Sequence, residues 1–250
     1  MIRRLLNRSR SELEKTATVP EGAKVYAIGD IHGRADMLDA LLSAIEDDAG
    51  AFDETTLVFL GDYVDRGPDS KGVLERLTRL QKSHDNAFFL KGNHEEIMLD
   101  FLAEPEDLPH WLDWGGEETL ESYGVDPVGQ SATALAEAMN AALPTAHRNF
   151  LKTLALTHTE GDYLFVHAGL RPGAPLEDQS ETDLLWIRKR FHNAPPDDRP
   201  DFVVVHGHTP TDKPVDAGWR IGVDTGACYG GLLTAVVLEG TTRRFISVKS

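Results

Sequence analysis

The chain has 250 residues, 41% hydrophobic and 26% charged, a composition that is typical of a globular protein and excludes a collagenous, disordered or coiled-coil chain. Its 41 acidic residues outnumber 25 basic ones, and the net charge of −16 argues against nucleic acid or a membrane surface as a partner. A single cysteine, Cys228, excludes an internal disulfide and a four-thiolate zinc site. Since no apolar run reaches the roughly 18 residues of a membrane span, we expect a cytoplasmic protein, with a monomer as the default.

The N-terminus is basic, in contrast to the acidic remainder of the chain. Residues 1–15 carry four arginines and one lysine against two glutamates, without the apolar stretch and cleavage site of a secretory signal. We predict a basic arm over residues 1–23, frayed or helical, ahead of a single domain over residues 24–250.

The first half of that domain alternates between strands and helices. Buried strands are predicted at 24–28, 56–60 and 87–90, and amphipathic helices at 36–48 and 70–82. This alternation predicts a parallel sheet with right-handed crossovers.

The middle and the end of the chain differ from that pattern. Residues 95–159 hold few strand-like runs, and their proline and glycine residues separate short helical stretches, so we predict a helical insertion over one side of the sheet. Connections between the later strands are mostly too short for helices, which predicts an antiparallel or mixed arrangement. These later strands are expected at 163–166, 202–205, 220–223, 232–238 and 245–248.

Polar clusters of one chemical type follow five of the expected strands. Ligands in open sheets gather at the carboxyl ends of the strands, so five such clusters predict one shared site. The clusters are Asp30 with His32, Asp62 with Asp65 and Arg66, Asn93 with His94 and Glu95, then His167, and finally His206 with His208.

The donor atoms of these clusters are oxygen and nitrogen, with no thiolate among them, which favours Mn²⁺, Fe or Zn²⁺ over a soft metal. They exceed the ligand count of one tetrahedral ion. A pair of ions roughly 3.5–4 Å apart that shares a carboxylate is the natural arrangement.

The ordered motifs GDIHG, GDYVDRG, GNHE, VHAG and GHT, spread between about Val25 and Gly226, resemble those of the calcineurin-like metallophosphoesterases. The form of the first three resembles the phosphoprotein phosphatase branch, and the length resembles the small bacterial and phage enzymes of the lambda-phosphatase type. The resemblance implies a four-layer αββα sandwich, in which two mixed sheets are flanked by helices and carry the helical insertion.

The resemblance also implies roles for the clustered residues. Asp30 and His32 would bind a first metal, Asp62 would bridge both metals, and Asn93, His167 and His208 would complete the second. His94 would be the general acid, oriented by Asp65. The phosphate would be held by Arg66, Arg188 and Asn93. Arg190, two residues after Arg188, is the alternative candidate for the second arginine. The implied cofactors are two divalent ions, Mn²⁺ first, with Fe or Zn²⁺ as alternatives.

By the same resemblance, the function would be removal of phosphate from phosphoserine and phosphothreonine proteins, with phosphotyrosine as a further candidate, by in-line attack of a metal-bridging hydroxide. An alternative is a symmetrical dinucleoside tetraphosphate hydrolase, for which Trp114, Tyr123 or Trp186 could stack on a base. The insertion and the loop with Arg188 would separate the two. A non-catalytic scaffold is disfavoured because every motif position is filled.

Three further residues receive an interpretation from sequence. His206 is expected to be structural, because the resemblance assigns a ligand role only to His208. Glu95 holds either His94 or a backbone turn, and the sequence leaves both open. Asp224 begins an Asp-Thr-Gly triplet that imitates an aspartic protease, but only one copy is present and the lambda-type phosphatases carry a similar segment, so the protease mechanism is disfavoured.

Overall fold

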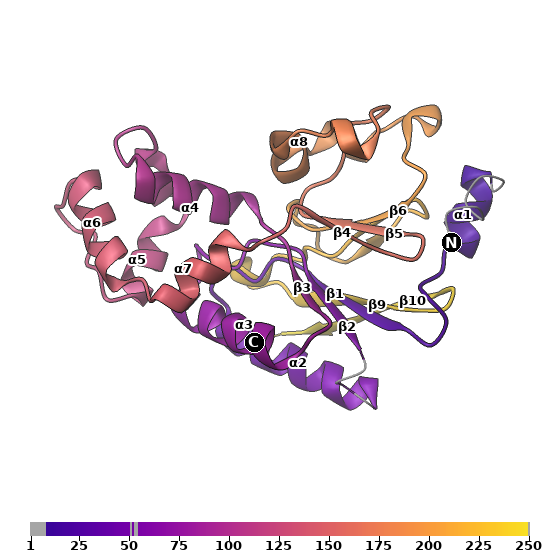
Figure 1. Ribbon diagram of the computed structural model, residues 1–250, viewed down its shortest axis with the longest axis horizontal. Coiled ribbons are helices and arrows are strands. Elements are labelled where there is room, and N and C mark those ends of the chain that lie inside the picture. Colours follow the sequence, from indigo (N-terminus) through magenta and orange to yellow (C-terminus); the bar gives the residue numbers. More distant parts are fainter. Residues whose placement is uncertain (1–8, 51, 53–54, 250) are drawn as a thin grey trace.

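The computed structural model describes residues 9–50, 52 and 55–249, and its first sheet has the strand order β10-β9-β1-β2-β3 (Figure 1). Strands β1, β2 and β3 are parallel, as predicted, and helices α2 and α3 connect them. Strands β9 and β10 add to β1 in antiparallel fashion. The bounds are β1 Lys24–Ile28, α2 Ala35–Ala49, β2 Thr56–Phe59, α3 Ser70–Ser83, β3 Ala87–Phe89, β9 Leu233–Glu239 and β10 Thr242–Val248.

The second sheet has the order β4-β5-β6-β8-β7 and is mixed, as predicted. Strands β5, β6 and β8 are parallel, and β4 and β7 pair antiparallel at the two edges. Its strands are β4 Thr157–Glu160, β5 Tyr163–Val166, β6 Val203–His206, β7 Val215–Asp216 and β8 Arg220–Gly222.

Two features of this half were not predicted from the sequence. The edge strands β4 and β7 were missed, because they are short and largely unburied and so lack an apolar run. The connection from β5 to β6 carries two helices, α8 Glu181–Trp186 and α9 Lys189–His192, whereas most of the later connections were expected to be too short for helices. A parallel pair needs a long crossover, and this one has the room for it.

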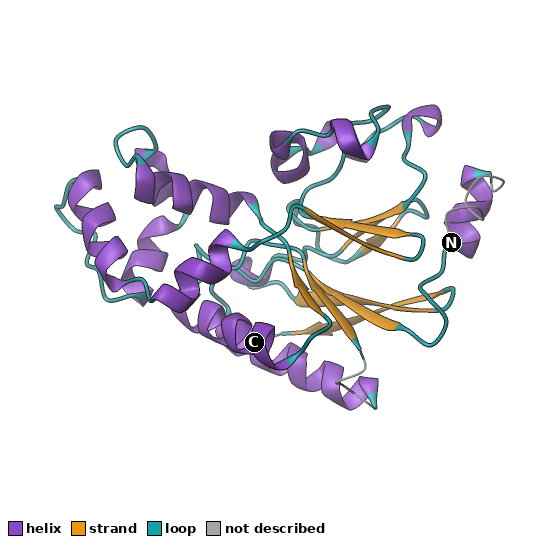
Figure 2. Ribbon diagram, viewed as in Figure 1, coloured by secondary structure: helices purple, strands orange, loops and turns teal. Residues whose placement is uncertain are grey.

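Three apolar clusters hold the layers together. One lies between the sheets and includes Val58 and Val205, a second packs α2 and α3 on the first sheet, and a third packs α8 and α9 on the second sheet. Figure 2 shows the resulting order of helix layer, sheet, sheet and helix layer. The predicted αββα sandwich is therefore confirmed.

The helical insertion is confirmed, but its placement differs in part from the prediction. Phe150 of α7 packs edge-on against Phe89 of β3, whereas the other insertion helices gather beyond the ends of the strands (Figure 1). The insertion consists of α4 Asn93–Ala103, the 3₁₀ helix η3 Pro109–Trp114, α5 Gly116–Ser122, α6 Ala132–Ala142 and α7 Thr145–Lys152. It thus stands next to the carboxyl ends of β2 and β3.

The described part of the N-terminal arm packs on the domain. Helix α1, Arg10–Thr16, is capped by Ser9, and its Leu13 is buried in the cluster between the sheets. The backbone carbonyl of Glu14 accepts a hydrogen bond from Arg243 of β10. Residues 1–8 lie outside the described residues, and the domain boundary at residue 24 stays a prediction. None of the described helices is long and apolar enough to cross a membrane.

Candidate active site

The clusters predicted from five strand ends meet in one buried place. The six predicted metal ligands are each at most 4% exposed. They lie after the carboxyl ends of β1, β2, β3, β5 and β6, where the two sheets come together. These ligands are Asp30, His32, Asp62, Asn93, His167 and His208.

The backbone of the site is strained. Among the described residues, every non-glycine residue with positive φ was singled out from sequence as a site residue. Such conformations cost on the order of 1–3 kcal/mol each and persist where the surrounding fold enforces them. The residues and their φ values are His32 (44°), Asp62 (53°), Asp65 (71°), Arg66 (68°) and His208 (64°).

Glu95 enforces the turn that carries Asp62. Its buried carboxylate accepts hydrogen bonds from four backbone amides, at 2.9, 2.7, 3.2 and 2.9 Å. The sequence left two roles open for Glu95, and these bonds identify it as the residue that holds the backbone turn. The four donors are the amides of Asp62, Tyr63, Val64 and Gly92.

Asp62 lies at the centre of the site. Its Oδ2 is 3.4 Å from Nε2 of His32, and its Oδ1 is 3.4 Å from Nε2 of His167. Each imidazole uses its other nitrogen, Nδ1, to donate to a backbone carbonyl at 2.8 Å. The Nε2 lone pairs therefore face Asp62, and a hydrogen-bonded Nδ1 is the usual arrangement of a metal-ligating histidine.

The donor set fits a divalent cation. Oδ1 of Asn93 lies 3.0 Å from Nε2 of His167, so two acceptor atoms face each other without a proton between them. Nε2 of His208 is buried, and no described residue offers it a hydrogen-bond partner. Two groups of potential ligands, His32 with Asp62 and His94, and Asp62 with His167 and His208, share Asp62. A cation is the partner that this arrangement of lone pairs and carboxylate requires.

The protonation states agree with ligand chemistry. Burial lowers the pKa of His32 to about 3 and that of His208 to about 2, so both rings are neutral at pH 7. Burial, followed by the charges of Asp224 and Asp62, raises the pKa of Asp30 well above its ordinary value. Metal binding needs neutral imidazoles and ionised carboxylates. The positive charge of a bound cation would stabilise the ionised form of Asp30.

Asp224 belongs to this site, although sequence reasoning set it aside. Its charge contributes to the raised pKa of Asp30, whose oxygens accept from the backbone amide of His208 at 3.2 and 2.9 Å. Asp224 follows the carboxyl end of β8. The rule that found the other strand-end clusters would therefore have found it too.

His94 and Asp65 form the predicted pair. Nδ1 of His94 is 2.7 Å from Oδ2 of Asp65. Burial works against a charged ring, but the charges of Asp62 and Asp65 outweigh it and raise the pKa of His94. The insertion adds two residues that were not predicted, since Trp111 Nε1 donates to Asp65 at 3.0 Å and Thr119 Oγ1 at 2.7 Å.

The two predicted arginines flank the ligands. Nη1 of Arg66 donates to Nε2 of His32 at 2.7 Å, so the guanidinium competes with a metal for that lone pair. Arg188 precedes α9, is exposed, and its charge contributes to the lowered pKa values of His167 and His208. The choice of Arg188 over Arg190 stays a prediction.

Other candidates lie apart from the ligands. His206 contacts the carbonyl of Gly207 and lies in neither ligand group, in agreement with the structural role expected for it. Tyr123 is buried, with its hydroxyl 2.8 Å from Nδ1 of His147, so it offers no face for a base. Burial raises the pKa of Cys228 to about 11, which keeps its sulfur a thiol.

The match to a family model described as calcineurin-like phosphoesterase covers residues 23–231. The chain belongs to this family of metal-dependent phosphoesterases, and its relatives include a serine/threonine-protein phosphatase, consistent with the branch that the motifs predicted.

Individual relatives carry two different activities in their names. Serine/threonine-protein phosphatase 1 of Salmonella typhimurium is 31% identical, over 86% of this chain and 92% of that protein. The asymmetrical bis(5'-nucleosyl)-tetraphosphatase PrpE of Halalkalibacterium halodurans is 26% identical, over 89% of this chain and 92% of that protein. A crystal structure of a candidate diadenosine tetraphosphatase has a TM-score of 0.65 and 27% identity, and covers 94% of this chain and 97% of that one. The alternative of a symmetrical dinucleoside tetraphosphate hydrolase is thereby corrected, because the relative with that kind of substrate is named as an asymmetrical enzyme.

Proposed function

We propose that the protein is a metal-dependent phosphomonoesterase that removes phosphate from phosphoserine and phosphothreonine residues of proteins. The observation that carries this proposal is the position of Asp62 between two groups of metal-ligand atoms, next to the buried His94–Asp65 pair. This combination provides a place for a phosphate and a proton donor for the leaving oxygen.

In this proposal the site would hold two divalent ions, Mn²⁺ first. Asp30, His32 and Asp62 would hold one, and Asp62, Asn93, His167 and His208 would hold the other. When bound, such ions supply a water of lowered pKa as the nucleophile and neutralise charge on the phosphate oxygens.

The chain's own residues would bind the phosphate and supply the proton for the leaving oxygen. Arg66 turns from His32 to the phosphate and, with Arg188, donates to the phosphate oxygens that carry charge in the transition state. Asp65 binds Nδ1 of His94, so the proton that His94 delivers to the leaving oxygen resides on Nε2.

A second candidate function is the asymmetrical hydrolysis of a dinucleoside tetraphosphate. It is favoured by aromatic side chains near Arg66: Trp114 is 43% exposed and Tyr229 is 64% exposed, so both offer a face to a base. Against it, the described cations at the site amount to two arginines, which suits one phosphate better than a chain of four.

A paired assay with Mn²⁺ separates the two functions. Phosphate release from a phosphoserine peptide and cleavage of diadenosine tetraphosphate are measured at equal concentrations. Preferred release from the peptide supports the phosphoprotein phosphatase. Preferred formation of ATP and AMP would leave the site assignment intact but replace the substrate, and formation of two ADP would contradict the asymmetrical alternative.

A further inference from the structure

A cavity of about 440 Å³ opens beside Arg66. One of its walls comes from the helical insertion at Trp114 and Gly115, and the opposite wall comes from Tyr229 in the 3₁₀ helix η6, Ala227–Tyr229. Arg66 joins both walls. Its backbone amide donates to the carbonyl of Gly115 at 3.1 Å, and its guanidinium lies 5.6 Å from the ring centroid of Tyr229. Whatever enters this cavity is therefore adjacent to the residue proposed to hold the phosphate.

Two aromatic rings of this cavity face solvent. Trp114 and Tyr229 are two of the three large hydrophobic side chains of the described residues that are exposed. Trp114 is nevertheless held in place by ring contacts with His110, at 5.4 Å, and with Trp186, at 6.0 Å. Trp186 is anchored by a 2.6 Å hydrogen bond to Glu96. An exposed ring that is fixed in this way offers a binding face at little entropic cost.

Two carboxylates lie in the same cavity. Asp113 and Glu118 line it, and the described residues provide neither a hydrogen bond nor an ion pair to either side chain. Tyrosine and tryptophan faces attract cations, and free carboxylates add to that attraction. A second phosphate in this cavity would instead meet two like charges.

We propose that this cavity binds a cationic side chain, a lysine or an arginine, close to the phosphorylated residue of a protein substrate. This inference rests on the proposed function and names its substrate class: phosphoserine or phosphothreonine with a basic neighbour. Arg66, whose guanidinium lies against the Tyr229 ring, would bind the phosphate on one side, while Trp114 and the two carboxylates receive the cation on the other. The strongly acidic chain, with a net charge of −16, favours such a substrate at longer range as well.

The test uses phosphoserine peptides in which one position, from four residues before the phosphoserine to four after it, is arginine in one set and alanine in the other. With Mn²⁺ present, the best arginine peptide is expected to have a KM about tenfold lower than its alanine partner, as one cation–π contact and one partly exposed ion pair would give. The difference should shrink at 0.5 M NaCl, because exposed charges are screened.

Variants then locate the effect. In the double variant D113N/E118Q, the ratio of the two KM values should fall toward one. The matched control E117Q/E121Q removes the same charge from exposed positions of α5 outside the cavity and should keep the ratio. Thermal unfolding of both variants checks that each is folded.

The outcomes are distinct. Equal KM values for arginine and alanine peptides at every position would overturn the inference and leave the proposed function standing. An equal loss of preference in both double variants would also overturn it, because the effect would then be general electrostatics. Absence of hydrolysis of every peptide, with diadenosine tetraphosphate cleaved, would overturn the proposed function and this inference with it.

Discussion

The hydroxyl of Thr119 gives the sharpest test of how the insertion supports the proposed acid. Thr119 is fully buried, and its Oγ1 donates to Asp65 Oδ1 at 2.7 Å while accepting from the Asp65 amide at 2.9 Å. Thr119→Val keeps the shape and removes both bonds, together with the 3.0 Å contact between Thr119 Oγ1 and Ser70 Oγ. Loss of a hydrogen bond to a charged group costs about 1.5–3 kcal/mol. The Asp65 amide keeps Ser70 Oγ as an acceptor at 3.0 Å, so we expect a loss of about 2 kcal/mol in the free energy of unfolding.

A loss of that size leaves the protein folded, because domains of this kind have about 5–15 kcal/mol in total. The activity should respond selectively. With Thr119 changed, Asp65 keeps only Trp111 as a side-chain donor besides His94, and the orientation of the imidazole loosens. General acid catalysis contributes about 10²–10⁴-fold, so we expect kcat on a phosphoserine peptide to fall by about tenfold. Turnover of p-nitrophenyl phosphate, whose leaving group needs little protonation, should change far less.

Urea unfolding and steady-state kinetics on both substrates measure these effects. Thr119→Ser is the matched control, because it restores the hydroxyl, and it should recover most of the stability and the peptide activity. The reasoning would be refuted if the free energy of unfolding of Thr119→Val lay within about 0.5 kcal/mol of the parent value. It would also be refuted if kcat fell by the same factor on both substrates.

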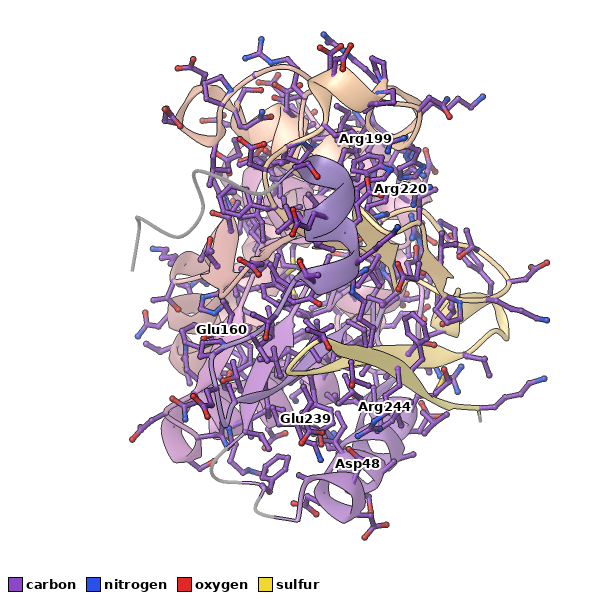
Figure 3. All side chains as sticks on the ribbon, turned by 90° about the vertical axis from the view of Figure 1, so that its right-hand side faces the viewer. Asp48, Glu160, Arg199, Arg220, Glu239 and Arg244 are labelled. Atoms are coloured by element: carbon purple, nitrogen blue, oxygen red, sulfur yellow. The ribbon has the colours of Figure 1, made fainter. Side chains whose placement is uncertain are left out.

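Three further predictions test other parts of the structure. His94→Asn should keep the bound metal but reduce turnover of the phosphoserine peptide far more than that of p-nitrophenyl phosphate, and equal losses would remove His94 from the acid role. Asp62→Asn should lose both ions when Mn²⁺ content is measured after dialysis, and two retained ions would contradict the shared carboxylate. The pKa of Asp48 is lowered mainly by its hydrogen bond to Arg244, near which it lies in Figure 3, so its carboxylate stabilises the fold above the unfolded pKa of 3.8. Asp48→Asn should therefore lower Tm at pH 7 by more than at pH 3, and an equal difference at both pH values would refute this assignment.

The sequence by itself determined the strands of the first sheet and the residues that follow them. Buried strands are short apolar runs that any reader of the chain can locate, and polar residues directly after them, such as Asp30, Asp62 and Asn93, must meet at one edge if the strands are parallel. The motif series then indicated the family, and the match over residues 23–231 confirmed it. The catalytic and metal-binding roles themselves stay predictions that the experiments above address.

The tertiary structure alone decided which distant residues support the site. Trp111 and Thr119 reach Asp65 across 46 and 54 residues of chain, and nothing in their local sequence distinguishes them from other insertion residues. The choice of the backbone turn for Glu95 also required coordinates. Local sequence patterns determine the elements, because periodic burial is a short-range property. Contacts between elements depend on how whole layers pack, and a single chain carries no local signal for them.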